Sequence, residues 1–328
     1  MKELKVGKNE QNQRFDKLLA KYLNLAPISF IYKMLRKKNI TLNGKKAAGN
    51  EVLKAGDEIK IFLSDETFDK FSSVKSKKQE TNIKLPDIPV LYEDENVMFL
   101  NKPVGILSQK AAKDDVSANE WVISYLLKKG ELSKEDMKTF SPGICNRLDR
   151  NTSGILAAGK SLSGLQELSR LFRERTIDKY YYALVSGCVR QGKRIEGYLL
   201  KDEKTNQVSI RPEQLPGADR IITAYRPVAT NGKETLLDIE LVTGKTHQIR
   251  AHLSSIGLPI IGDPKYGNVQ ANRYAKQTSK INRQLLHCHR LHFPAMDGAL
   301  QNLSGKTIEA PLPEDFLRFM ENEQIRQR

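Results

Sequence analysis

One carboxylate placed between two arginines is the feature of this sequence best suited to chemistry. Asp149 stands between Arg147 and Arg150 in a polar stretch at residues 146–154, which runs into four apolar residues at 155–158. The pattern predicts a polar turn that leads into a buried strand. A loop end on a rigid scaffold is a common place for a reactive group. We therefore expect an enzyme that acts on an anionic substrate through Asp149.

A second candidate group lies on a short helix predicted within residues 243–257. Thr246 is expected to cap the helix, and Gly257 is expected to end it. At helical spacing, one stripe of side chains is apolar and the neighbouring stripe is polar. The apolar stripe contains Ile249, Leu253 and Ile256, and the polar stripe contains His247, Arg250 and Ser254. Arg250 is therefore presented together with His247.

Three consecutive tyrosines lie in a strand predicted at residues 179–187. Alternation places Lys179 and Tyr181 on one face of the strand, and Tyr180 and Tyr182 on the other. Tyr181 can therefore face a site that its two neighbours do not face. The plain alternative is that all three rings pack on the sheet as ordinary strand aromatics. The pattern leaves both interpretations open.

The histidines offer a rival interpretation as a metal site. His247 and His252 are five positions apart, which turns a helix by about 140°, so they do not share a face as a zinc-binding pair four apart does. Further along the chain, His287 and His289 share a predicted strand face, but no acidic ligand accompanies them. We therefore expect no metal site.

The composition favours a polyanionic partner. The chain has 328 residues, and its 54 Lys and Arg exceed its 39 Asp and Glu, which gives a net charge of +15. No apolar run is long enough to span a membrane, and the first residues lack the apolar stretch of a signal peptide. The three cysteines match neither a disulfide framework nor a zinc motif. We expect a cytoplasmic protein with reduced cysteines that binds nucleic acid and no membrane.

The excess charge is concentrated near the N-terminus. Residues 1–64 contain 12 Lys and 2 Arg against 6 acidic residues, a net charge of +8. Residues 65–84 are polar, rich in Lys and Ser and without apolar periodicity, which is typical of a flexible linker. We therefore divide the chain into a small basic domain at 1–64, a linker at 65–84 and a larger domain at 85–328.

Both domains are expected to mix helices and strands. In the basic domain, apolar residues at helical spacing predict two short helices, and Asn43-Gly44 predicts a hairpin turn. The larger domain alternates strands, turns and helices without a regular βαβ rhythm. This favours an α+β fold with a mixed, mainly antiparallel sheet. For the lysines of the basic domain, the plain alternative is a solvated charged face.

The basic domain resembles the small RNA-binding domain first known from ribosomal protein S-four. The resemblance covers residues 13–63 and rests on Arg14-Phe15-Asp16-Lys17, the helix end at Leu35-Arg36, the turn at 40–45 and Ala55-Gly56-Asp57. It implies contacts with RNA phosphates, which give affinity and salt dependence but little sequence reading. The residues implied are Arg14, Lys17, Arg36, Lys37, Lys38 and Lys45.

Residues 85–317 resemble the RluA-type pseudouridine synthases, segment by segment. The usual Asp motif of that family is His-Arg-Leu-Asp, two variable residues and Thr-Ser-Gly, and here Asn146 takes the place of the histidine. The further matching segments are Asn101-Lys102-Pro103 with Gly105, Lys179-x-Tyr181-x-Ala183, Thr243 to Arg250, Gly262-Asp263 and Tyr266-Gly267. Their order and spacing together carry the resemblance.

The resemblance implies the isomerisation of uridine to pseudouridine in RNA, without a cofactor. Asp149 would be the essential carboxylate, acting as nucleophile or as base towards the 2′ position. Arg250 would pair with Asp149 and favour its charged form. Tyr181 would stack on the uracil and help to remove the ring proton. Expected contacts with the substrate are Arg147, which would fill the gap left by the flipped base, together with Thr152, Lys179, Lys245, His247 and Ile249.

Two departures from the family pattern and two rival functions stay open. If the enzyme is active with Asn146, that position can only donate and accept hydrogen bonds or hold the loop. Lys245, where arginine is frequent, keeps a cation near phosphate. A non-catalytic RNA-binding protein would explain the charge, and a metal-dependent hydrolase would explain the histidines. We expect an enzyme acting on large-subunit ribosomal RNA, with transfer RNA as the alternative, as a monomer without an obligate protein partner.

Overall fold

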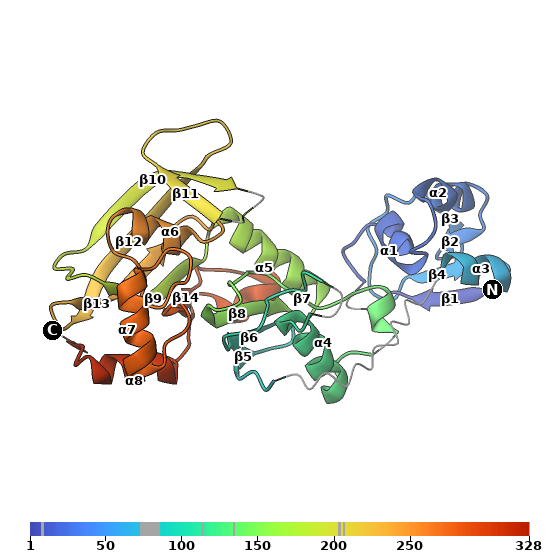
Figure 1. Cartoon of the computed structure of the whole chain (residues 1–328). Coiled ribbons are helices and arrows are strands. Elements are labelled where there is room, and N and C mark those ends of the chain that lie inside the picture. Colours follow the sequence, from blue (N-terminus) through green and yellow to red (C-terminus); the bar gives the residue numbers. More distant parts are fainter. Residues whose placement is uncertain are drawn as a thin grey trace.

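The chain forms a small N-terminal part and a larger part built on one long sheet (Figure 1). The computed structural model describes residues 1–7, 10–72, 86–112, 115–133, 135–202, 205 and 207–327. Each part has a hydrophobic core of its own. None of the helices within these ranges has the length and apolar content that crossing a bilayer requires.

The N-terminal part contains the two predicted helices, a third helix that was not predicted, and a small antiparallel sheet. Its strands lie in the order β1-β4-β2-β3, and Phe15, Leu19 and Ile31 lie at the centre of the core. The two predicted helices and the turn at Asn43-Gly44 are present. The elements are β1 (Lys2–Lys5), α1 (Phe15–Tyr22), α2 (Ile28–Arg36), β2 (Ile40–Leu42), β3 (Lys45–Lys46), β4 (Glu58–Ile61) and α3 (Asp65–Phe71).

The first residues of the predicted linker form a helix, so this part of the linker prediction is wrong. Ser64 caps α3 by accepting a hydrogen bond from the Thr67 amide. Phe68 and Phe71 pack against the N-terminal core, where Phe71 lies 4.4 Å from Phe30 between ring centres. Two apolar anchors three residues apart were enough to hold a helix in an otherwise polar stretch. Residues 73–84 of the predicted linker lie outside the described residues.

The larger part is an α+β fold with a mixed, mainly antiparallel sheet, as predicted. Among the described residues, nine strands follow one another across the sheet in the order β11-β10-β12-β13-β9-β14-β8-β6-β5. Every neighbouring pair in this series is antiparallel except β14 and β8. Three short strands join at the sides, since β15 pairs with β14, β16 with β12 and β7 with β8.

The strands of the larger part are β5 (Val90–Glu93), β6 (Val97–Lys102), β7 (Gly143–Ile144), β8 (Ser153–Gly159), β9 (Asp178–Ser186), β10 (Lys193–Asp202), β11 (Gln207–Arg211), β12 (Asp219–Thr230), β13 (Glu234–Leu241), β14 (Leu286–His292), β15 (Thr307–Glu309) and β16 (Arg326–Gln327). The helices are α4 (Ala118–Lys129), α5 (Leu162–Glu174), α6 (Gln248–Ser255), α7 (Val269–Ser279) and α8 (Glu314–Asn322), with short 3₁₀ turns at Asp136–Lys138 and Gly298–Leu303.

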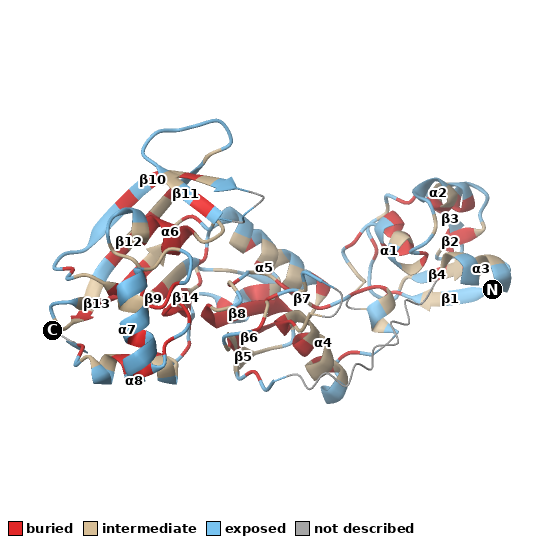
Figure 2. Cartoon of the chain, viewed as in Figure 1, coloured by how far each residue is buried: buried red, intermediate tan, exposed pale blue. Residues whose placement is uncertain are grey.

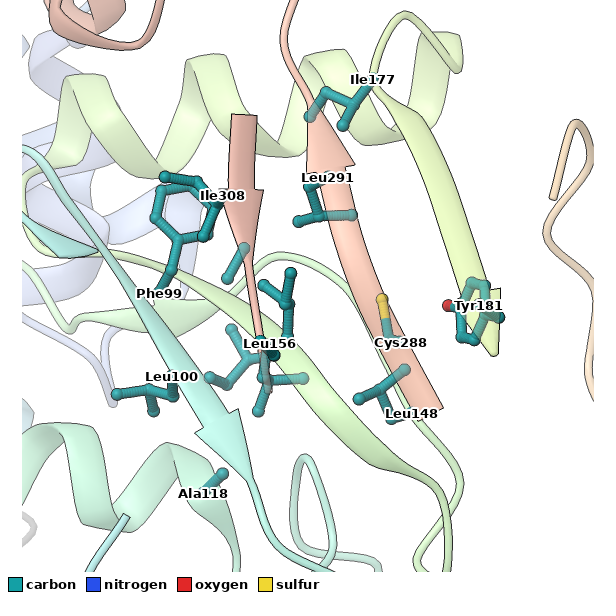
Figure 3. Close-up of a cluster of buried hydrophobic side chains, with 14 of the residues drawn as sticks. Phe99, Leu100, Ala118, Leu148, Leu156, Ile177, Tyr181, Cys288, Leu291 and Ile308 are labelled. Atoms are coloured by element: carbon teal, nitrogen blue, oxygen red, sulfur yellow. The ribbon is translucent and has the colours of Figure 1, made fainter. Parts of the chain in front are cut away.

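Helices cover both faces of the central strands, and this buries them (Figure 2). One core joins β6, β8, β9 and β14 to α4, α5 and α6, and Figure 3 shows part of it around Phe99, Leu156 and Leu291. A second core packs α7 and α8 on the opposite side of β9 and β13, with Phe316 and Phe319 at its centre. All three cysteines are free, as predicted.

The strand that follows Asp149 can begin only with glycine at its second position. All seven residues of β8 are buried. Gly154 has a φ of +113°, and a Cβ atom there would lie 2.2 Å from the carbonyl oxygen of Cys288 on β14. Because Gly154 has no side chain, β8 and β14, the one parallel pair of the series, can lie close together. This contact follows the loop that carries Asp149.

Replacing Gly154 by alanine should lower the free energy of unfolding by about 3–5 kcal/mol, because the new methyl group adds a backbone clash to an unfavourable φ. Gly232→Ala is the matched control, since Gly232 has a φ of +90° but open space around its Cβ position, and should cost about 1–2 kcal/mol. Urea unfolding of the two variants measures the difference. Equal losses would show that the contact between β8 and β14 is less tight than described.

Candidate active site

Asp149 lies in an ion pair with Arg250, as expected. The Arg250 Nη1 atom donates to Asp149 Oδ2 at 2.8 Å, while its Nε and Nη2 atoms donate to the two oxygens of Asp263 at 2.7 and 2.9 Å. The side chain of Asp263 is fully buried, whereas that of Asp149 is 30% exposed. One guanidinium thus joins a buried carboxylate to an accessible one. The accessible carboxylate is the one that can meet a substrate.

The carboxylate of Asp263 fixes the direction of Arg250. A bidentate pair locks the plane of the guanidinium, and Asp263 Oδ1 also accepts from the amides of Lys265 and Tyr266 at 2.9 and 3.1 Å. Burial alone would lower the pKa of Arg250, but the hydrogen bonds and charges of Asp263 and Asp149 outweigh it and raise that pKa. The sequence analysis included Asp263 in a matching segment but predicted no role for it, because no nearby residue pattern identifies it as the partner of Arg250.

The arrangement leaves one oxygen of Asp149 open. Oδ2 accepts from Arg250, whereas Oδ1 accepts no hydrogen bond from any residue within the described ranges. An ionised carboxylate with one oxygen held and the other open can act as a nucleophile or as a base. The geometry therefore supports the chemistry that the sequence suggested for this residue.

Asn146 holds the start of the Asp149 loop against β8. Its amide group donates to the carbonyl of Ile155 at 3.2 Å and accepts from the amide of Ala157 at 2.8 Å. An asparagine side chain can donate and accept at once, as a strand backbone does. Asn146 therefore positions the loop by hydrogen bonds and needs no titration.

Two buried side chains hold the rest of the loop. Ser108 Oγ donates to the carbonyl of Leu148 at 2.9 Å and accepts from the amide of the same residue at 3.0 Å. Lys102 Nζ donates to the carbonyls of Pro103 and Ile106, both at 2.9 Å, and to that of Arg150 at 3.2 Å. The backbone is thus held on both sides of Asp149.

Lys102 supports the Asp149 loop, which the sequence did not reveal. Burial lowers its pKa to about 7, against the opposing pull of the Asp149 charge. Its place in the Lys-Pro segment was recognised, but the three carbonyls that it binds are known only from the fold. Ser108 gave no sequence signal at all.

Tyr181 lies apart from its two neighbours, as predicted. It is buried, with 6% of its surface exposed, and Figure 3 shows its hydroxyl turned toward Cys288 on β14. On the other face, Tyr180 lies over Arg290 and Tyr182 stacks on His289. Burial raises the pKa of Tyr181 well above its ordinary value, and Cys288 and the charge of Asp149 act in the same direction. Its phenol therefore stays protonated in the free protein.

Helix α6 (Gln248–Ser255) begins one residue later than predicted. Thr246 does not cap it, because the N-terminal boundary is His247 in the left-handed conformation, with a φ of 53° and no capping side chain. Gln248 instead closes the turn, and its Oε1 accepts from Thr243 Oγ1 and from the Lys245 amide. Ile256 was predicted to lie on the apolar stripe of the helix, but it follows the last helical residue, Ser255, and is 40% exposed.

The six expected substrate contacts divide into accessible and buried residues. Arg147 is exposed and makes no hydrogen bond or ion pair with any described residue. Lys245 pairs with Asp219 at 2.7 Å, and Lys179 donates to the carbonyl of Ile177 at 3.0 Å. His247 lies beside Asp149, with its Nε2 atom 3.9 Å from Oδ2.

Direct substrate contact does not fit the burial of Thr152 and Ile249. Thr152 Oγ1 accepts from Gln284, and its amide closes a turn onto the carbonyl of Asp149. Ile249 belongs to the main core. The side chain of Thr152 helps to hold the Asp149 loop, and that of Ile249 packs α6 on the main core. Neither side chain is placed to touch a substrate.

The histidine pair on β14 does have an acidic neighbour, contrary to the sequence interpretation. His289 Nε2 lies 3.0 Å from Asp238 Oδ1, whereas His287 Nδ1 lies 2.9 Å from Ser153 Oγ. The other oxygen of Asp238 already accepts from Arg226. Within the described residues, no three His, Cys, Asp or Glu side chains come together as metal ligands would.

The cations expected to bind RNA are exposed on the N-terminal part. Arg14 is partly engaged, since it donates to Asp16 at 3.1 and 2.8 Å, and Tyr32 donates to the same carboxylate. Its side chain remains half exposed. The other five cations of the expected set are also exposed, namely Lys17, Arg36, Lys37, Lys38 and Lys45.

A hollow of about 450 Å³ lies near this site but does not contain it. Lys102, Ser153 and Arg283 line the hollow, and neither Asp149 nor Arg250 does. A hollow of this volume is within the usual size range of small-molecule sites, but it lacks the two charged groups of the ion pair. The ion pair of Asp149 with Arg250 instead points to the surface at Asp149 as the candidate active site.

Comparisons with known proteins identify the family of this chain. The family model for RNA pseudouridylate synthases matches residues 96–255. An uncharacterized RNA pseudouridine synthase of Mycoplasma genitalium is 30% identical over 89% of both chains. The ribosomal large subunit pseudouridine synthase C of Vibrio vulnificus is 30% identical over 97% of this chain and 95% of its own. The corresponding protein of Buchnera aphidicola from Schizaphis graminum is 33% identical, over 96% and 95%.

One solved structure is similar in fold. It is the human RNA pseudouridylate synthase domain containing 4, with a TM-score of 0.58 at 20% identity. The similarity covers 73% of this chain and 94% of the human one. At this identity it supports the fold described above.

Replacing Asp263 by asparagine should lower the free energy of unfolding at pH 7 by about 3–5 kcal/mol, because a buried cation loses its partner. Asp219→Asn is the control, since this exposed partner of Lys245 should contribute about 0–1 kcal/mol.

The difference between wild type and Asp263→Asn should depend on pH. Burial acts to raise the pKa of Asp263, but the hydrogen bonds and charge of Arg250 hold that pKa below the ordinary aspartate value of 3.8. The stabilisation is therefore complete above that value and is lost as the pH falls through the lower folded pKa. Urea unfolding at pH 7 and at successively lower pH measures it. A gap that stays constant down to low pH would contradict the charge-based explanation.

Proposed function

This chain belongs to the RNA pseudouridine synthase family, and we infer that Asp149 is the group that isomerises uridine to pseudouridine, with large-subunit ribosomal RNA in the cytoplasm as the substrate. The observation that carries the assignment is the accessible Asp149 carboxylate, held through Arg250 by the buried Asp263. The names of the relatives from Vibrio and Buchnera support ribosomal RNA. Transfer RNA is the second candidate substrate.

The reaction requires one bond to break and another to form on the same sugar. The bond from ring nitrogen N1 to C1′ breaks, the uracil turns, and ring carbon C5 bonds to C1′. The proton leaves C5, and N1 ends protonated, so no redox partner or cofactor is needed. Asp149 would act through its open oxygen, either by attacking C1′ or by removing a proton from C2′.

Tyr181 would provide the surface against which the uracil turns. Because little of its ring is exposed, the side chains over it must move aside when a base enters. Its raised pKa means that it enters the reaction as a neutral phenol. To accept the C5 proton it would first have to pass its own proton on, so we propose ring contact as its main role.

A uridine inside a helix must be flipped out before it can reach Asp149. Arg147 is two residues away on the same held loop and is exposed. A guanidinium plane can stack between bases. We propose that Arg147 occupies the space that the flipped base leaves.

We propose that residues 1–71 form the RNA-holding unit, because α3 packs on the N-terminal core. The net charge of +8 in residues 1–64 would bind phosphates without reading sequence. The catalytic domain would then follow from about residue 85. Binding should weaken steeply as salt rises.

Tritium release from uridine labelled at C5 tests the function directly. With unmodified large-subunit ribosomal RNA, the wild-type protein should release tritium, and Asp149→Asn should be slower by about 10⁴-fold or more because its amide can neither attack nor take a proton. Tritium release from transfer RNA but not from ribosomal RNA would identify transfer RNA as the substrate. Release from neither RNA, or undiminished release by Asp149→Asn, would overturn the proposal.

Replacing Arg250 by lysine should slow tritium release by about 10²- to 10³-fold. An ammonium cannot keep the bidentate bond to Asp263 and also reach Asp149. Arg283→Lys is a matched control, because the Arg283 side chain is also 5% exposed and donates from Nε and Nη2 to the two oxygens of Asp315. The rate is measured in single turnover with saturating RNA. Equal rates for the two lysine variants would remove Arg250 from the mechanism.

A further inference from the structure

The hydroxyl of Tyr266 lies between a backbone amide and His247. The amide of Val208 on β11 donates to Tyr266 Oη at 3.0 Å, and His247 Nδ1 lies 3.0 Å from the same oxygen. The ring of Tyr266 also lies under Arg250, whose guanidinium carbon is 5.2 Å from the ring centre. Tyr266 therefore contacts both groups that face Asp149 Oδ2.

These contacts favour one position for the proton of His247. A backbone amide can only donate, so the Tyr266 oxygen accepts from Val208 and keeps its own proton to donate. The acceptor within reach among the described residues is His247 Nδ1. A neutral imidazole that accepts at Nδ1 carries its proton on Nε2. The opposite assignment would leave the phenol proton without an acceptor there.

The surroundings keep His247 neutral. Burial lowers the pKa of His247; the charges of Arg250 and Lys265 act in the same direction, and those of Asp149 and Asp263 oppose them. The net shift is downward. The Nε2–H group is then a fixed donor on an uncharged ring.

This donor points toward the catalytic carboxylate without yet reaching it. His247 Nε2 lies 3.9 Å from Asp149 Oδ2, the oxygen that Arg250 already binds at 2.8 Å. A distance of 3.9 Å is too long for a hydrogen bond. His247 also adopts a left-handed backbone with a φ of 53°, which is uncommon outside glycine and must be held by its surroundings.

We propose that Tyr266 fixes His247 as an Nε2–H donor that closes onto Asp149 Oδ2 when RNA binds, and that both are positioning residues which keep the other carboxylate oxygen free for the sugar. This proposal rests on the proposed role of Asp149. Two donors on one oxygen would restrain rotation about the Cβ–Cγ bond of Asp149, and this would fix the plane of the carboxylate and the direction of its other oxygen. Through Val208 the same hydroxyl also ties β11 to the site.

The protonation of His247 can be measured without any activity. Nitrogen-15 spectra of protein labelled in its five histidines report which ring nitrogen carries the proton, and loss of one signal set in His247→Asn assigns it. We expect the Nε2–H form in the wild type and a mixture of both neutral forms in Tyr266→Phe. An Nδ1–H form in the wild type would overturn the proposal, whatever RNA the enzyme uses.

Two substitutions at His247 separate positioning from simple structural support. Asparagine tolerates the left-handed backbone, but its short amide does not reach Asp149, so single-turnover tritium release at saturating RNA should fall by about 10- to 100-fold. Glutamine places an amide donor near the position of Nε2 and should recover most of the rate. Affinity for RNA, measured by filter binding, should change by less than about twofold in either variant.

Other outcomes decide against the proposal. A loss of RNA affinity that accounts for the whole loss of rate would make His247 a substrate contact. A glutamine variant no faster than the asparagine variant, with both melting like the wild type, would remove the donor role. If the wild type itself released no tritium, the proposed function would fail, while the nitrogen-15 spectra would still decide the hydrogen-bond assignment.

Discussion

The structure depends on one buried cation that two carboxylates share. A guanidinium with no partner could not stay in the interior, and Asp263 provides a partner with two parallel hydrogen bonds. The remaining guanidinium nitrogen of Arg250, Nη1, then points toward Asp149 and donates to it. This is consistent with the burial of Arg250 in α6, beside the buried polar side chains of Gln248 and His252. It also explains how a carboxylate 101 residues away in the chain can be held at a fixed distance.

The loop around Asp149 is held by its backbone, and this leaves its side chains free. Asn146, Ser108 and Lys102 each bind main-chain atoms of the loop or of the adjoining strand. A loop pinned in this way can present Arg147 to solvent without losing the position of Asp149. Rigidity of the backbone beside exposed side chains is what an enzyme needs when it must grip a large substrate and place one carboxylate accurately.

Much of the fold could be predicted from the sequence, because periodicity reports burial directly. The strand after Asp149, the strand of Tyr181 and the two helices of the N-terminal part are all present. Predictions that depended on one local residue type were less secure. Thr246 was expected to cap α6, but the helix has no capping side chain, and Gln248 instead binds the turn that precedes it. Partners distant in sequence could not be found, since no local pattern joins Asp263 to Arg250 or Ser108 to Leu148.

The position of β14 in the sheet has a consequence for the synthesis of the protein. This strand lies between β9 and β8, so it joins the half of the sheet that carries Tyr181 to the half that follows Asp149. Its residues, Leu286–His292, come late in a chain of 328. Because synthesis runs from the N-terminus, the strands of both halves are made before the strand that joins them. The sheet can therefore close only after Leu286–His292 has been made, and β8 and β9 reach their final places beside their common neighbour only then.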